Sequence, residues 1–111
     1  MRLAREEAFG PVVAVMPFAD EESALELANA TVYGLTAALW TNDLKRALRM
    51  VRQLAAGTVW VNAVQVLTPT APFGGFKSSG TGRDLGMEGM VQFQETKTVI
   101  VDLNDWPMAF F

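Results

Sequence analysis

A glycine-rich stretch from Pro72 to Gly86 constrains the fold of this chain more than any other feature. Five of the nine glycines in the protein fall within these fifteen residues. Glycine adopts positive φ angles and lets other backbone approach closely, so this density predicts a loop with a specific irregular path. A flexible linker is the alternative, but such linkers are rich in Ser and Gly without aromatic residues. Phe73 and Phe76 flank the glycine pair and need a surface to pack on. The sequence therefore favours an ordered loop.

Two phosphate-binding templates fail in this stretch. A P-loop requires glycine directly before its Lys-Ser/Thr pair, whereas Phe76 precedes Lys77. The dinucleotide fingerprint requires Gly-x-Gly-x-x-Gly directly after a strand, and Gly80, Gly82 and Gly86 leave one residue too many in the second gap. We therefore do not expect the loop to hold a phosphate in either way.

The amino-acid composition limits which classes of protein this chain can belong to. The chain has 111 residues, of which 50% are hydrophobic and 19% charged, and this is ordinary for one globular domain. Its net charge of -3 argues against a nucleic-acid surface, because such surfaces are basic. No apolar run approaches the ~18 residues of a membrane span, and no signal peptide is visible. We therefore expect a cytoplasmic protein that binds neither nucleic acid nor membrane.

Cysteine and histidine are both absent from the 111 residues. Without cysteine, the chain itself offers no disulfide, no thiolate metal ligand and no thiol nucleophile. Without histidine, it lacks the side chain that most often serves as a general base or metal ligand. We therefore expect no catalytic residue and no metal site built from these residues alone.

Patterns along the chain predict strands and helices in turn. Strands are expected over residues 12–18, 36–41, 58–61 and 97–103, and helices over residues 20–28, 44–55 and 84–94. The first strand is a continuous apolar run that suits burial on both faces. The order β-α-β-α-β-loop-α-β predicts an α/β fold of three layers, in which helices cover a mostly parallel sheet.

Capping residues set the expected helix ends. Asp20 is expected to cap the first helix, because a carboxylate accepts hydrogen bonds from the free N–H groups of the first turn. Thr41 or Asn42 is expected to cap the second helix, and Gly57 to end it.

Four sequence blocks then follow one another in a recognisable order. They are Glu6-Glu7-x-Phe9-Gly10-Pro11-Val12, Tyr33-Gly34-Leu35-Thr36-Ala37, Gly57-Thr58-Val59-Trp60-Val61-Asn62 and Pro72-Phe73-Gly74-Gly75-x-Lys77-x-Ser79-Gly80-x-Gly82-Arg83. Together they resemble the C-terminal portion of the aldehyde dehydrogenase superfamily, in register over essentially the whole chain. The departures are small: Ala8, Asp84 and Phe93 stand where the family more often has a larger aliphatic residue, Glu and Tyr.

The resemblance implies roles for residues at matching positions. Glu7 resembles the carboxylate that accepts hydrogen bonds from the ribose hydroxyls on the nicotinamide side of NAD or NADP, and a carboxylate suits this task because it offers only acceptors. Phe9 resembles the aromatic residue that packs near the nicotinamide ring. Gln65, Leu67 and Phe73 fall where the family lines its substrate channel, and an apolar wall there suits a small aldehyde.

The resemblance also implies a mechanism whose central parts lie outside these residues. In the family, a cysteine thiolate attacks the aldehyde, hydride passes to NAD(P), and a glutamate general base helps water to cleave the thioester. The nucleophile, that glutamate and the dinucleotide-binding domain lie upstream of the matched region. We therefore expect the chain alone to be inactive and to bind no cofactor by itself.

Two functions of different classes are compatible with the sequence. The first is the C-terminal fragment of an NAD(P)-dependent aldehyde dehydrogenase, which oxidises aldehydes to carboxylic acids when the upstream domains are supplied. The second is a stand-alone, non-catalytic module derived from that fold, which assembles with itself or with a partner.

The end of the chain predicts an interface. Residues 1–96 are assigned to the C-terminal part of the catalytic domain, and residues 97–111 to an oligomerisation strand and tail. The strand carries little charge to protect its edge, and Trp106, Met108, Phe110 and Phe111 follow it closely. Exposed strand edges recruit other strands, and apolar patches of this kind mark interfaces. We therefore expect a homo-oligomer with Val99, Val101, Trp106 and Phe110 buried between chains.

Overall fold

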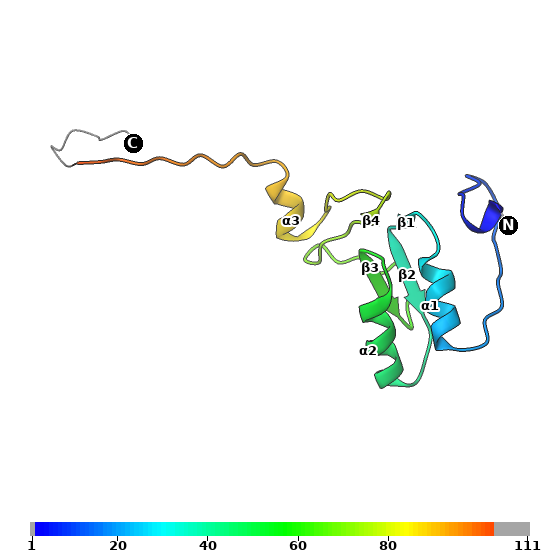
Figure 1. Ribbon diagram of the computed structural model, residues 1–111. Coiled ribbons are helices and arrows are strands. Elements are labelled where there is room, and N and C mark those ends of the chain that lie inside the picture. Colours follow the sequence, from blue (N-terminus) through cyan, green and yellow to red (C-terminus); the bar gives the residue numbers. More distant parts are fainter. Residues whose placement is uncertain (1, 104–111) are drawn as a thin grey trace, which may run out of the picture.

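The computed structural model describes residues 2–103, which form two small sheets with helices beside them (Figure 1). The elements are η1 (Arg2–Ala4), α1 (Glu21–Asn29), β1 (Tyr33–Gly34), β2 (Thr36–Leu39), α2 (Leu44–Gln53), β3 (Thr58–Val61), β4 (Phe76–Lys77) and α3 (Gly86–Val91). The α/β class predicted from the sequence is confirmed. Three complete layers are not seen in this part of the chain, because each sheet has two strands.

The parallel pair β2–β3 is the centre of the structure. Thr36 lies opposite Thr58 at one end, and Leu39 lies opposite Val61 at the other. The helix α2 connects these two parallel strands, as crossover connections usually do. The second sheet is the short antiparallel pair β1–β4, in which Tyr33 lies opposite Lys77. It brings the glycine-rich loop back to the segment between α1 and β2.

Carboxylates cap both long helices. The predicted cap Asp20 is confirmed: its carboxylate accepts from the backbone N–H of Ser23 at 2.9 Å, and the Ser23 hydroxyl accepts in return from the N–H of Asp20. The predicted cap of the second helix was wrong. Asp43 caps α2 by accepting from the N–H of Arg46 at 3.0 Å, while the backbone of Thr41 is engaged by the Asn62 side chain.

An ion-pair cluster joins the two helices. The carboxylate of Glu21, in the first turn of α1, accepts two hydrogen bonds from the guanidinium of Arg49 on α2, at 3.0 and 2.9 Å. Arg46 lies 3.5 Å from the same carboxylate. This paired geometry fixes the relative orientation of α1 and α2 more specifically than a single lysine contact would.

Two predicted strands are absent from the described residues. Residues 12–18 run as an extended segment beside α1 without forming a strand, and residues 97–103 leave the end of α3 as an extended segment (Figure 1). The reason is that a strand needs a neighbouring strand to pair its N–H and C=O groups, and among residues 2–103 no strand pairs with either segment. The predicted interface residues Val99 and Val101 are exposed in this arrangement, and the tail from 104 to 111 lies outside the described residues.

Two helix ends also differ from the prediction. The helix α3 covers Gly86–Val91 rather than residues 84–94, because Asp84 pairs with Phe73 in an isolated bridge and cannot enter the helix. The helix α2 ends at Gln53 with Leu54 as its C-cap, so Gly57 does not end it. The requirement for glycine at position 57 has a different cause, which lies in the contact with the glycine-rich loop described below.

Little apolar surface is buried within the described residues. The buried hydrophobic side chains are Leu25, Ala47 and Ala56, and no large side chain there is fully buried. The radius of gyration is 21.6 Å, whereas a compact domain of this length has a radius of about 13 Å. Val13, Val15 and Phe18 of the extended segment stand in solvent. The chain therefore presents apolar faces that a covering partner would bury.

Acid is expected to unfold the helices by protonating their capping carboxylates and the carboxylate of Glu21. Hydrogen bonds from Ser23 lower the pKa of Asp20, that from Arg49 lowers the pKa of Glu21, and that from the Arg46 backbone lowers the pKa of Asp43. As the pH falls, these carboxylates therefore take up protons in the unfolded chain before they do so in the folded chain. Their stabilisation of the fold is complete above the ordinary pKa values of 3.8 for Asp and 4.5 for Glu, and it is lost as the pH falls through the lower pKa values of the folded chain.

Circular dichroism at 222 nm between pH 7 and pH 2 measures this loss. The double variant Asp20→Asn, Asp43→Asn is the matched control, because asparagine caps a helix without titrating. We expect its helix signal to fall less steeply below pH 4.5 than that of the unchanged chain. Identical profiles would contradict the assignment of the transition to these caps.

Candidate functional site

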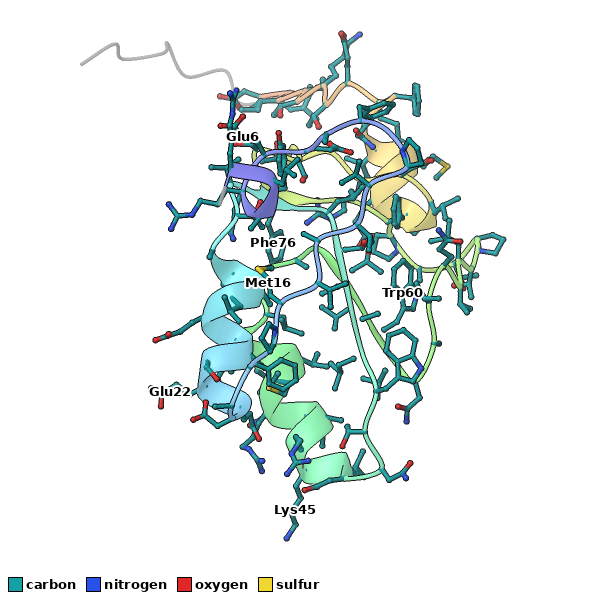
Figure 2. All side chains as sticks on the ribbon, turned by 90° about the vertical axis from the view of Figure 1, so that its right-hand side faces the viewer. Glu6, Met16, Glu22, Lys45, Trp60 and Phe76 are labelled. Carbon is teal, nitrogen blue, oxygen red and sulfur yellow. The ribbon has the colours of Figure 1, made fainter. Side chains whose placement is uncertain are left out.

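The N-terminal turn faces the middle of the chain across a hollow of about 450 Å³. One wall is the turn that contains Glu6 and Glu7, and the other is the segment from Tyr33 to Ala37 with Ala55, Ala56 and Ser79. In Figure 2 the labelled Glu6 lies at the η1 turn, above Phe76 of β4. Backbone, hydroxyl and carboxylate groups thus meet small apolar side chains in one place. Such a mixture is typical of ligand sites.

The floor of this hollow is fixed by Asn29, the last residue of α1. Its side-chain amide donates to the carbonyl oxygen of Gln53 at 2.9 Å, and its side-chain oxygen accepts from the N–H of Ala55 at 2.8 Å. The two bonds satisfy backbone groups on both sides of the end of α2. Gly34 then passes close to this connection, because a Cβ atom there would lie 2.5 Å from the carbonyl oxygen of Ala55.

The glycine-rich loop is ordered and attached to the same floor, which confirms the prediction of an ordered loop. The Lys77 ammonium donates to the carbonyl oxygens of Asn29 and Thr31 at 3.0 and 3.1 Å, so a cation lies at the C-terminal end of α1, where the helix dipole favours it. The hydroxyl of Ser79 accepts from the N–H of Gly34 at 3.0 Å.

Arg83 holds the loop from inside. Its guanidinium donates to the carbonyl oxygens of Gly75 and Gly82, both at 2.9 Å, and lies 5.6 Å from the ring centre of Phe76. A positive charge over an aromatic face is attracted by the ring quadrupole. The next residue, Asp84, exchanges two backbone hydrogen bonds of 2.7 Å with Phe73. The two ends of the loop are therefore tied together.

Glycine at position 57 is required by the backbone of this loop. A Cβ atom on Gly57 would collide with the carbonyl group of Gly74, and both glycines of the pair Gly74–Gly75 are buried. The loop therefore lies directly against the start of β3. Phe73, directly before the glycine pair, is half-buried.

The five predicted site residues lie on three segments of the chain, which are the N-terminal turn, the glycine-rich loop and the loop after β3. Glu7 lines the hollow described above, and Phe9 lines an adjoining hollow of about 190 Å³ and is exposed. Phe73 is half-buried and lines a separate hollow with Arg83 and other loop residues. Gln65 and Leu67 are exposed on the loop after β3. No single hollow contains all five of these residues.

Comparison with known proteins decides the family. The profile of the aldehyde dehydrogenase family matches residues 1–99. The chain belongs to the aldehyde dehydrogenase family. It is 49% identical over 111 residues to an aldehyde dehydrogenase of Deinococcus radiodurans, and 52% identical over 101 residues to the NADP/NAD-dependent aldehyde dehydrogenase PuuC of Escherichia coli. These alignments cover 100% and 91% of the chain, but 22% and 20% of the relatives.

Solved structures of aldehyde dehydrogenases support the same family assignment. A betaine aldehyde dehydrogenase double mutant from Staphylococcus aureus, in complex with NAD+, superimposes with a TM-score of 0.93 at 41% identity, over 100% of this chain and 22% of that one. The crystal structure of a putative aldehyde dehydrogenase from Burkholderia cenocepacia superimposes with a TM-score of 0.89 at 45% identity, over 98% of this chain and 22% of that one. The chain thus spans about a fifth of the length of the aldehyde dehydrogenases it matches.

Some residues that build the site were not singled out from the sequence. No pattern in the sequence assigned a role to Asn29, and Ser79 and Tyr33 stand only within the blocks that resemble the family. A polar side chain at the end of an apolar stripe could have indicated a bridging role for Asn29. The contacts of Ser79 and Tyr33 join segments more than forty residues apart, and no local pattern carries that information.

Two observations concern sites of other kinds. Within residues 2–103 no group of three or more potential metal-ligating side chains is placed to hold a metal ion. No helix among the same residues has the length and apolar character needed to cross a membrane.

The contact between the glycine-rich loop and β3 can be tested with two alanine substitutions. Gly57→Ala forces a methyl group into the Gly74 carbonyl, so we expect it to destabilise the chain by about 1–3 kcal/mol or more. Gly80→Ala is the control, since its Cβ would meet open space and only its φ of +98° opposes the change, at about 1–2 kcal/mol. Thermal unfolding followed by circular dichroism compares the two. A smaller loss for Gly57→Ala than for Gly80→Ala would show that the loop does not lie there.

Proposed function

We propose that these residues form the C-terminal part of an NAD(P)-dependent aldehyde dehydrogenase that oxidises an aldehyde to a carboxylic acid. The observation that carries the proposal is the combination of family membership over residues 1–99 with a hollow at which Glu7 lies. The thiol nucleophile comes from outside the 111 residues, since these contain no cysteine, and the family resemblance implies that the general-base glutamate lies upstream as well. The chain therefore supplies binding and positioning rather than covalent chemistry.

Glu7 fits the ribose-binding role. It is exposed, and within residues 2–103 it has no hydrogen-bond or ion-pair partner, whereas the neighbouring Glu6 pairs with Arg2 at 2.6 Å. An unpaired carboxylate at the rim of a hollow can accept hydrogen bonds from two adjacent hydroxyl groups. NAD or NADP, when bound, accepts the hydride. Phe9 presents an exposed aromatic ring two residues later, which suits packing against a planar nicotinamide.

The substrate side is proposed for Gln65, Leu67 and Phe73. Leu67 and Phe73 present apolar surface, and apolar surface favours the hydrocarbon part of an aldehyde over water. Phe73 is fixed by its two backbone hydrogen bonds to Asp84 and by the glycine pair that follows it. A wall held in this way can orient a small substrate toward a nucleophile from another part of the enzyme.

Activity of the isolated chain is the first test. The 111-residue chain is expected to reduce no NAD or NADP at 340 nm with propanal or hexanal, because no side chain here forms the covalent intermediate. Supplied with the upstream part of the Escherichia coli relative, at 52% identity, it is expected to restore aldehyde oxidation. Absence of activity in an assembled complex, with the chain stably bound, would favour the stand-alone, non-catalytic module.

Glu7 is tested in the same assembled enzyme. Glu7→Gln keeps the size of the side chain but removes its charge, and hydrogen bonds to charged groups contribute about 1.5–3 kcal/mol. We therefore expect the KM for NAD or NADP to rise about tenfold or more, with little change in the KM for the aldehyde. Glu6→Gln is the matched control and should leave both constants within twofold, because Glu6 is engaged with Arg2.

Assembly is the last test of this proposal. The exposed apolar faces of the chain, and the residues 97–111 predicted to form an interface, favour a homo-oligomer. Size-exclusion chromatography with light scattering is expected to give a mass above that of one chain of 12.1 kDa, and Val99→Lys with Val101→Lys to lower it. A monodisperse monomer at high micromolar concentration would show that these faces do not drive association.

A further inference from the structure

The loop after β3 carries two of the proposed channel residues on a segment with few restraints. Among residues 2–103, the segment 63–67 makes one hydrogen bond to the rest of the chain. In that bond the indole Nε1–H of Trp60 donates to the carbonyl oxygen of Val66 at 2.8 Å. Val66 lies between Gln65 and Leu67, so the bond acts on the backbone that joins both channel residues.

Both ends of the loop are held independently of Trp60. At the start, the Asn62 side chain accepts from the N–H of Thr41 at 2.8 Å and donates to its carbonyl oxygen at 2.9 Å. At the end, the N–H of Gly86 donates to the carbonyl oxygen of Pro69 at 3.0 Å. Loss of the indole bond would therefore release the middle of the loop and leave its ends in place.

The middle of the loop needs such a restraint because its backbone is unusual. Gln65 has a φ of 57°, in the left-handed region that non-glycine residues rarely occupy. Such a conformation persists only where the surroundings hold it. With the bond from Trp60 one residue away, the Gln65 side chain keeps one direction; without it, the segment can return to commoner φ angles and redirect the side chain.

Trp60 is itself well placed to act as an anchor. It is paired with Ala38 across the parallel sheet, and its side chain is half-buried. In Figure 2 the labelled Trp60 lies on the side of the molecule along which the loop after β3 runs. A large ring on a strand loses little additional freedom when it makes a hydrogen bond, so it positions a loop effectively.

We propose that Trp60 is a positioning residue for the aldehyde side of the site: its indole N–H holds the Val66 carbonyl and thereby sets where Gln65 and Leu67 lie. The inference rests on the proposed function, because it treats these two residues as part of the substrate channel. Trp60 acts through the loop, so the bound cofactor and the chemical step depend on it less than substrate binding does.

The test uses the assembled enzyme with Trp60→Phe, which keeps an aromatic ring and removes the donor. We expect the KM for hexanal to rise about threefold to tenfold, the range that corresponds to one lost hydrogen bond. The KM for propanal should rise less, since a shorter aldehyde makes fewer contacts along the channel. The kcat and the KM for NAD or NADP should stay within about twofold, a split that general destabilisation would not produce.

Trp40→Phe is the matched control. Trp40 is exposed, lies just after β2, and its indole makes no hydrogen bond among the described residues, so its replacement should leave all constants unchanged. A second replacement of Trp60 by the benzothiophene analogue of tryptophan, which has sulfur in place of N–H, should reproduce the effect of phenylalanine with the ring size unchanged. If neither replacement at position 60 changes the KM for hexanal, the inference is wrong.

A measurement on the unassembled 111-residue chain separates this inference from the proposed function. With ¹⁵N-labelled tryptophan, the indole N–H of Trp60 is expected to exchange with solvent at least about tenfold more slowly than that of Trp40, because only the former is engaged. Equal exchange rates for the two indole N–H groups would show that Trp60 does not hold the loop, whatever the activity of the assembled enzyme. If the indole N–H of Trp60 exchanges slowly but the assembled complex shows no activity, the positioning role of Trp60 stands and the aldehyde dehydrogenase function is rejected.

Discussion

The rest of the structure depends on the close approach between the start of β3 and the glycine-rich loop. Gly57 and Gly74 meet with no room for a side chain, and every later contact of the loop starts from this position. Only then can Lys77 reach the end of α1 and Ser79 reach Gly34. Glycine therefore serves two purposes here: it permits the irregular path of the loop, and it removes the atoms that would keep two backbones apart.

This arrangement joins polar groups well but buries little apolar surface. The hydrophobic effect is the main favourable term in folding. Much of the apolar surface of the described residues is not buried, and Val15, Phe18 and Phe93 are examples of exposed apolar side chains. Capping carboxylates and ion pairs cannot replace it, since exposed pairs contribute about 0–1 kcal/mol each. The chain matches about a fifth of the length of its relatives, and under the proposed function the other parts of the enzyme would cover these apolar faces.

Local patterns predicted what depends on local structure. Neighbouring residues predicted the first helix, its cap Asp20 and the strand from Thr58 to Val61, and all three are present. The strand predicted over residues 12–18 was wrong because pairing needs a partner, and sequence cannot show whether one lies within reach. The cap at Asp43 was missed because Thr41 and Asn42 are equally good caps in isolation, and the bond from Asn62 to Thr41 decides among them. The site residues came from family resemblance, since exposed residues such as Glu7 carry no periodic signal.

The glycine-rich loop also connects the two sides of the proposed site. Ser79 bonds to Gly34 beside the hollow that Glu7 lines, and Phe73 lies before the glycine pair at the substrate side. Hydride transfer needs the reacting carbon of the substrate and the nicotinamide ring at a fixed separation, and small misplacements cost much of the rate. A loop that Arg83 and Lys77 hold at several carbonyl oxygens can keep that separation, whereas a loop held by apolar contacts alone would allow sliding. Under the proposed function, the bonds from Arg83 within the loop and from Lys77 to the end of α1 serve positioning and not chemistry.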